Sequence, residues 1–138
     1  MNEIDAAIYS TLSGDATLSA LATGGVWRAV APEGATGCYI VFQLISSPED
    51  VRVMGNGASV QRYRYQVKAI MQGTSAVTPR SALSRVEALL DDAALALTPH
   101  NLVVCRRSGS LPDMVEPLEN EVIYQHVGAE YVVEVQVS

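Results

Sequence analysis

The feature that most constrains the fold is the segment Val60–Met71, in which apolar and polar residues alternate. Successive side chains of a strand point to opposite faces, so this period of two predicts a strand with one apolar and one polar face. The closing segment, Tyr131–Val137, alternates in the same way. The apolar face of the first segment consists of Tyr63, Tyr65, Val67, Ala69 and Met71, and its polar face of Arg62, Arg64, Gln66 and Lys68. Two such segments predict a sheet with one buried face.

Helices are predicted in three places. Asn2–Leu12 is amphipathic, and Asp15 can cap a second, short helix that runs to Leu21. The third has Thr78 as its cap and Pro79 at its first position, and its apolar stripe continues to Leu97, a length of about twenty residues.

The remaining strands complete a single domain over residues 1–138. Cys38–Ile45 is nearly all apolar, which is typical of a strand buried on both faces. Shorter strands are expected at Val26–Val30, Leu102–Arg107 and Glu121–Val127, followed by a turn or bulge at Gly128. The order is two helices, three strands, a long helix and three strands. It predicts an α+β fold, a mainly antiparallel sheet with two short N-terminal helices and one long helix packed on one face.

The composition indicates a chain that is assembled with others. Charged residues make up 17% of the sequence, against a usual fraction of about 25%, so much of the surface is neutral or apolar. The net charge of −6 argues against binding nucleic acid through a broad basic face. The two cysteines, Cys38 and Cys105, are expected as buried thiols in a reducing compartment. The acidic N-terminus and the short apolar runs predict neither a signal peptide nor a membrane span.

No motif for catalysis stands out. The histidines, His100 and His126, have no nucleophile motif beside them, and no metal-ligand spacing occurs. Gly55-Asn56-Gly57 is not followed by the Lys-Ser/Thr of a phosphate loop, and a hairpin tip explains it better. We therefore expect no enzyme and no catalytic, cofactor or metal site.

Two loops are predicted to contact partner proteins. The first, Ser46–Ser59, is a long hairpin connection, and the second, Ser108–Asn120, mixes acidic and apolar residues. Carboxylates in the second region could hold a cation, but a partner-facing loop is the favoured interpretation. The expected contact residues are Pro48, Asp50, Arg52, Met54, Asp113, Met114, Glu116 and Glu119.

The polar face of the alternating strand leaves alternatives open. Arg62, Arg64 and Lys68 could form a stripe for an acidic ligand or DNA. The favoured interpretation is charge pairing with Glu130 and Glu134 of the closing strand. Such pairs could also form between subunits, and the sequence does not separate the two arrangements.

In their order, several segments resemble the phage tail terminator, or tail completion, proteins of long non-contractile-tailed phages and gene-transfer particles. The resemblance covers about residues 3–137, and the two loops, which vary within the family, cannot be matched residue by residue. The segments are DAAIYSTLSGDATLSAL, VWRAVAPEG, CYIVFQLISSPED, RYRYQVKAI, SALSRVEALLDDA and HVGAEYVVEVQV.

The resemblance implies a structural virion protein that is assembled in the bacterial cytoplasm. Such proteins form a hexameric ring that caps the finished tail tube, ends its elongation and provides the head-joining surface. The implied partners are further copies of the chain, the tail tube protein and a head-neck connector protein, while DNA passes through the ring without specific binding. The alternatives are a head-side neck or connector completion protein and an unrelated small binding module.

Overall fold

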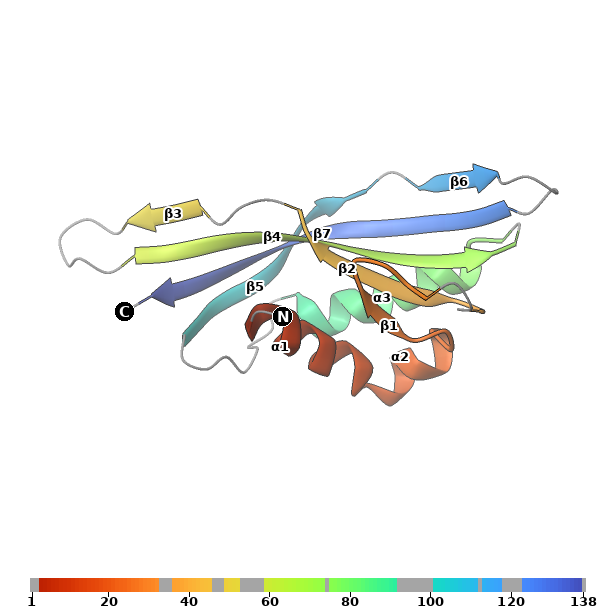
Figure 1. Ribbon diagram of the computed structural model, residues 1–138, viewed down its shortest axis with the longest axis horizontal. Coiled ribbons are helices and arrows are strands. Elements are labelled where there is room, and N and C mark those ends of the chain that lie inside the picture. The colour runs from red at the N-terminus through yellow and green to blue at the C-terminus, as the bar shows by residue number, and fades with distance from the viewer. Residues whose placement is uncertain are drawn as a thin grey trace.

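The computed structural model describes residues 3–32, 36–45, 49–52, 59–73, 75–91, 101–111, 113–117 and 123–137. It shows one long sheet with the helices gathered on one side (Figure 1). The elements in chain order are α1 (Glu3–Ser13), α2 (Ala16–Leu21), β1 (Val26–Arg28), β2 (Tyr39–Leu44), β3 (Glu49–Arg52), β4 (Ser59–Gln72), α3 (Val77–Leu90), β5 (Asn101–Ser110), β6 (Met114–Pro117) and β7 (Ile123–Val137).

The sheet is built on β4 and β7, which pair in antiparallel fashion from Ser59–Val137 to Gln72–Tyr124. Its strand order is β1-β2-β4-β7-β5, with β3 also beside β4 and β6 also beside β7. Only β1 and β2 are parallel among the described pairs. The predicted α+β class with a mainly antiparallel sheet is confirmed.

The core lies between the helices and one face of the sheet. Ile8 and Leu12 of α1, Leu18 of α2 and Val86 of α3 are fully buried, because each lies on the apolar stripe of its helix. On the sheet, the buried face follows the predicted alternation. Its core residues are Ile40, Phe42, Tyr65, Val67, Ala69, Tyr131, Val133 and Val135.

Two carboxylates attach the helices to their neighbours. Asp5 of α1 is only 1% exposed; it accepts a hydrogen bond from the Tyr65 hydroxyl at 2.6 Å and pairs with Arg28 Nε at 2.5 Å. Asp15 caps α2, as predicted, and binds the Arg85 guanidinium of α3 at 2.8 and 2.9 Å. The hydrogen bond from Arg85, aided by a backbone N–H, lowers the pKa of Asp15 to about 2.

The prediction that β2 is buried on both faces is wrong. Ile40 and Phe42 are fully buried, whereas the residues that alternate with them, Tyr39, Val41 and Gln43, are half-buried. The described helices cover only the first of these faces (Figure 1). The other face, here called the open face, has no described element packed over it.

The turn or bulge predicted at Gly128 is also wrong, because β7 runs unbroken through this residue. Gly128 pairs with Lys68 of β4, and the register shifts lie in β5 instead. A Cβ at Gly128 would lie 2.9 Å from the side chain of Leu111 and 3.0 Å from the carbonyl of Val67. Close packing therefore explains the glycine.

The elements also differ from expectation in the two predicted loops and at both ends of α3. The predicted loops contain β3 and β6, each added to the edge of a longer strand, so four strands precede α3. α3 begins at Val77, after an N-cap at Ala76 without a side-chain hydrogen bond, and Thr78 does not cap it. It ends at Leu90 because Asp91 is extended. The expected continuation to Leu97 lies outside the described residues.

Within the described ranges, no helix is long and apolar enough to cross a membrane.

Candidate functional site

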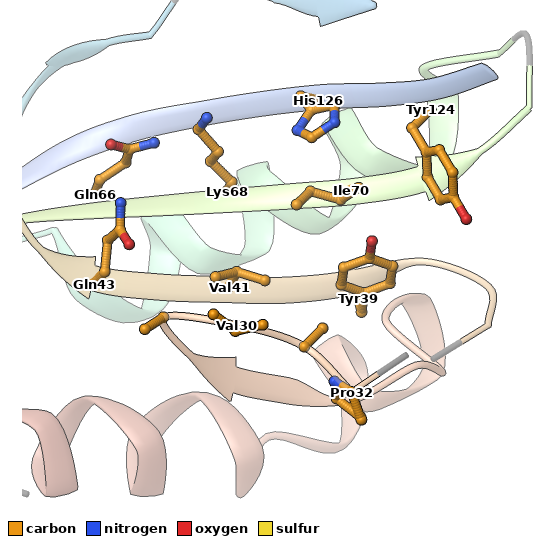
Figure 2. Close-up of a pocket in the computed structure, with 12 residues that line it drawn as sticks. Val30, Pro32, Tyr39, Val41, Gln43, Gln66, Lys68, Ile70, Tyr124 and His126 are labelled. Carbon is orange, nitrogen blue, oxygen red and sulfur yellow. The ribbon is translucent and has the colours of Figure 1, made fainter. Parts of the chain in front are cut away.

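The open face carries a groove that encloses about 390 Å³ (Figure 2). We call it the open-face groove. It is lined by residues 29–32, by Tyr39, Val41 and Gln43 of β2, by Gln66, Lys68 and Ile70 of β4, and by Tyr124 and His126 of β7.

The sheet register places the groove residues side by side. Tyr39 lies opposite Ile70, which lies opposite His126, and Val41 lies opposite Lys68. These residues share the face away from the helices because they alternate with the core residues of the same strands.

The outer wall of the groove forms where β1 ends. Ala29 has a left-handed φ of +65°, and its N–H still donates to the Phe42 carbonyl at 2.8 Å. The Val30 N–H turns back to the Arg28 carbonyl at 2.7 Å. This tight turn leaves the Val30 side chain 78% exposed at the groove.

His126 is held in the groove lining by β6. Its Nε2 lies 2.8 Å from a carboxylate oxygen of Glu116, while its Nδ1 is buried without a hydrogen-bond partner in the described structure. Burial, together with the neighbouring Tyr124 and Glu116, raises the pKa of the Tyr39 hydroxyl. His100 lies outside the described residues.

The polar face of β4, which carries Arg62, Arg64 and Lys68, divides into two parts. At one end, Glu134 lies opposite Arg62 at 3.3 Å and also binds Arg106 of β5 at 2.9 Å. Further along β4, Arg64 lies opposite Val132, and Glu130 lies opposite Gln66 rather than opposite a cation. Among the described residues, no ion pair involves Arg64, Lys68 or Glu130.

The described part of the predicted second contact loop contains the end of β5 and the edge strand β6. Asp113 binds Arg80 of α3 at 2.7 Å, and Glu116 binds His126. Met114 and Val115 between them are exposed. The predicted contact residue Glu119 lies outside the described residues.

The predicted first contact loop is also a strand in its described part. Asp50 and Arg52 lie on β3, opposite Gln61 and Ser59 of β4. Pro48 and Met54 lie outside the described residues. β3 and β6 lie at opposite ends of the β4–β7 ribbon (Figure 1).

The described part of the chain contains no group of His, Cys, Asp and Glu side chains that could hold a metal ion. Both thiols are buried, and burial raises the pKa of Cys38 to about 11 and that of Cys105 to about 12. A thiol with such a pKa is a poor nucleophile near neutral pH.

Reasoning from the sequence missed the open-face groove. A β2 strand buried on both faces would have left no open surface beside Lys68. One signal pointed the other way: Gln43 interrupts the apolar run on the same face as Tyr39.

The comparisons with known proteins identify a family and a shared fold. The family model of tail completion protein gp17 matches residues 6–113. A chain in the solved virion of a native gene transfer agent particle matches with a TM-score of 0.74 and 20% identity, over 98% of this chain and 96% of that one. A second solved protein matches with a TM-score of 0.59 and 17% identity, over 94% of this chain and 92% of that one. No curated protein sequence matches significantly.

Proposed function

The chain belongs to the tail completion protein gp17 family, and on this premise we propose that it forms a ring on the finished tail tube, ends tube elongation and provides the head-joining surface. The family match confirms the resemblance seen in the sequence, and the chain is a structural component of a phage-type virion tail. The expected ring is a hexamer whose partners are the tail tube protein and a head-neck connector protein. DNA passes through it without specific binding.

The family match over residues 6–113 carries this proposal. The open face supports the ring, because it holds half-buried apolar side chains that a neighbouring copy would cover. The low fraction of charged residues also favours permanent contacts between subunits.

The positions of β3 and β6 support contacts with two different partners. β6 pairs with Ile123–His126, and β3 flanks the part of β4 that pairs with Glu134–Val137. At about 3.3 Å per residue, the two segments lie roughly 35 Å apart along β7. A ring built from such subunits would present one contact segment toward the tail tube and the other toward the head.

The mass in solution tests the ring. A hexamer has six times the chain mass of 14.7 kDa, about 88 kDa, and native mass spectrometry of the purified full chain should detect it. A chain that stays monomeric at every concentration would contradict the ring and favour the small binding module.

Particle assembly tests the role in the tail. A strain that produces the particles but lacks this gene should make overlong tails without heads, as seen by electron microscopy. Tails of normal length without heads would instead support the head-side neck protein.

A matched pair of variants tests the contact surface at β6. Val115→Asp places a charge on an exposed apolar residue of β6, and Val77→Asp does the same on α3; the two side chains are 58% and 70% exposed. We expect the first variant to reduce particle yield and the second to leave it unchanged. Equal yields would contradict a contact through β6.

A further inference from the structure

We infer that a pocket between α1, α2 and β1, here called the helix-side pocket, receives the Val30 turn of the next copy of the chain. The Val30 turn consists of residues 29–32. The inference rests on the proposed function, and it names the contact by which one copy covers the outer wall of the next copy's open-face groove.

The helix-side pocket is preformed for an apolar side chain. It encloses about 200 Å³, and none of its described lining residues is charged. Tyr9 and Trp27 line it and are 44% and 36% exposed. Trp27 is fixed in place, because its indole N–H donates to the Gly24 carbonyl at 2.8 Å and its ring lies beside Gly25. The other lining residues are Ser13, Leu18, Ser19, Ala22, Gly25 and Val26. Aromatic side chains that are held in this way are frequent anchors of protein interfaces.

The chain around the helix-side pocket is also poor in charge. Within Ala6–Trp27 the one charged residue is Asp15, and the Arg85 guanidinium of α3 binds both of its carboxylate oxygens. At the overall charged fraction of 17%, a stretch of 22 residues would carry about four. The outer side of an amphipathic helix normally carries charges, whereas the core of a protein interface is depleted of them.

The Val30 turn has the matching chemistry and projects from the subunit. Val30 is 78% exposed, and the sequence of the turn, Ala-Val-Ala-Pro, is uncharged. The turn is held by the left-handed Ala29 and by the hydrogen bond from the Val30 N–H to the Arg28 carbonyl. Backbone strain of this kind is concentrated at functional positions. Figure 2 shows Val30 beside Val41, at the outer wall of the open-face groove.

The helix-side pocket and the Val30 turn fit each other in size and charge. A cavity of about 150 Å³ holds a benzene molecule, so the pocket is large enough for the three-carbon side chain of valine. Because neither side carries a charge, the contact buries no unpaired ion.

The positions of pocket and turn favour a contact between copies. Val30 lines the open-face groove of its own subunit and not the helix-side pocket, so a second copy is needed to fill that pocket. β1 is only three residues long, and natural sheets use such short edge strands to prevent pairing with another chain. A contact through side chains is therefore favoured at this edge. When it repeats head to tail, it is heterologous and closes into a ring if its rotation allows.

Two matched pairs of variants test the contact. Val30→Asp and Val77→Asp make the same change at valines that are 78% and 70% exposed, so both variants should fold. Val30→Asp should lower the association constant about tenfold or more, because it places an unpaired charge in the pocket, while Val77→Asp should leave it unchanged. Ser19→Glu at the pocket and Ser84→Glu at an exposed site on α3 form the second pair, with the same expectation. Sedimentation and native mass spectrometry measure assembly, and circular dichroism establishes that each variant is folded.

A mixture of the two interface variants tests whether pocket and turn are partners. Ser19→Glu keeps an intact Val30 turn, and Val30→Asp keeps an intact helix-side pocket. Their mixture should therefore form a one-to-one dimer of about 29 kDa, twice the chain mass of 14.7 kDa. The dimer should grow no further, because its remaining pocket and turn are the altered ones.

The outcomes separate this inference from the proposed function. If Val30→Asp forms the same rings as the wild type, the contact is wrong and the proposed ring stands. If both single variants lose the ring but their mixture forms no dimer at any concentration, the turn is not the occupant of the pocket. If the wild type stays monomeric or stops at a dimer, the proposed ring fails and this contact with it.

Discussion

Replacing Asp5 with alanine should destabilise the fold more than any exposed charge substitution. This carboxylate connects three elements, since α1 carries it, β4 supplies the Tyr65 hydroxyl and β1 supplies Arg28. Asp5 is 1% exposed and Tyr65 is fully buried, whereas the Arg28 side chain is about half exposed. The arginine can therefore turn to water when its partner is removed, while the tyrosine hydroxyl cannot.

The magnitude follows from these exposures. Loss of the acceptor for a buried hydroxyl costs about 1–3 kcal/mol. The pair with half-exposed Arg28 adds roughly 1 kcal/mol or less. We expect Asp5→Ala to lower the free energy of unfolding by about 1–4 kcal/mol, the sum of these two contributions. Asp5→Asn keeps an oxygen for the hydroxyl and should cost less.

Urea unfolding followed by circular dichroism measures this difference, at one protein concentration because assembly also stabilises the fold. Asp113→Ala is the matched control, since its ion pair with Arg80 is exposed and should contribute at most about 1 kcal/mol. Tyr65→Phe completes a double-mutant cycle, with an expected coupling to Asp5 of about 1–3 kcal/mol. The reasoning is refuted if Asp5→Ala and Asp113→Ala shift the unfolding midpoint equally, or if the coupling is zero.

Three further predictions concern the rest of the fold. The pKa of Asp15 is lowered to about 2 from an ordinary 3.8, so its carboxylate stabilises the folded state above about pH 4 and loses this effect as the pH falls toward 2. The difference in urea midpoint between wild type and Asp15→Asn should therefore shrink as the pH falls from about 4 to about 2. A difference that stays constant over this range would contradict the lowered pKa of Asp15. Gly128→Ala should lower the free energy of unfolding by about 1–3 kcal/mol through overpacking, while Gly109→Ala, whose Cβ would meet no atom within 4 Å, should stay within about 0.5 kcal/mol. Cys38 and Cys105 should resist a thiol reagent at about pH 8 in the folded protein and react in urea, as followed by absorbance; rapid labelling of the native protein would contradict their burial.

Much of the fold could be predicted because local patterns carry it. The buried stripe of α1 follows from the regular spacing of Ile4, Ile8 and Leu12. Asp15 caps α2 by accepting a hydrogen bond from the backbone N–H of Leu18, only three residues further along the chain. The alternation around Tyr65 and Tyr131 places both side chains in the core. Each of these depends on neighbours within one element, so the sequence alone was sufficient.

The strands β3 and β6 could not be predicted in this way. Each is four residues long, lies in a segment rich in turn-forming residues and is held by pairing with a distant strand. The same reason explains Gly128, which has the local signature of a turn. Its actual role depends on Leu111 and Val67, which come from other parts of the sheet.

The sequence by itself determined the α+β class, the buried face of the sheet and the family resemblance, because these follow from periodicities and from the order of segments. Only the tertiary structure decided which face of β2 stays open and that Lys68 lies in a groove beside Val41 and His126. Pairing between strands far apart in the chain creates that surface. It depends on where the helices pack, and no local pattern in the sequence records that choice.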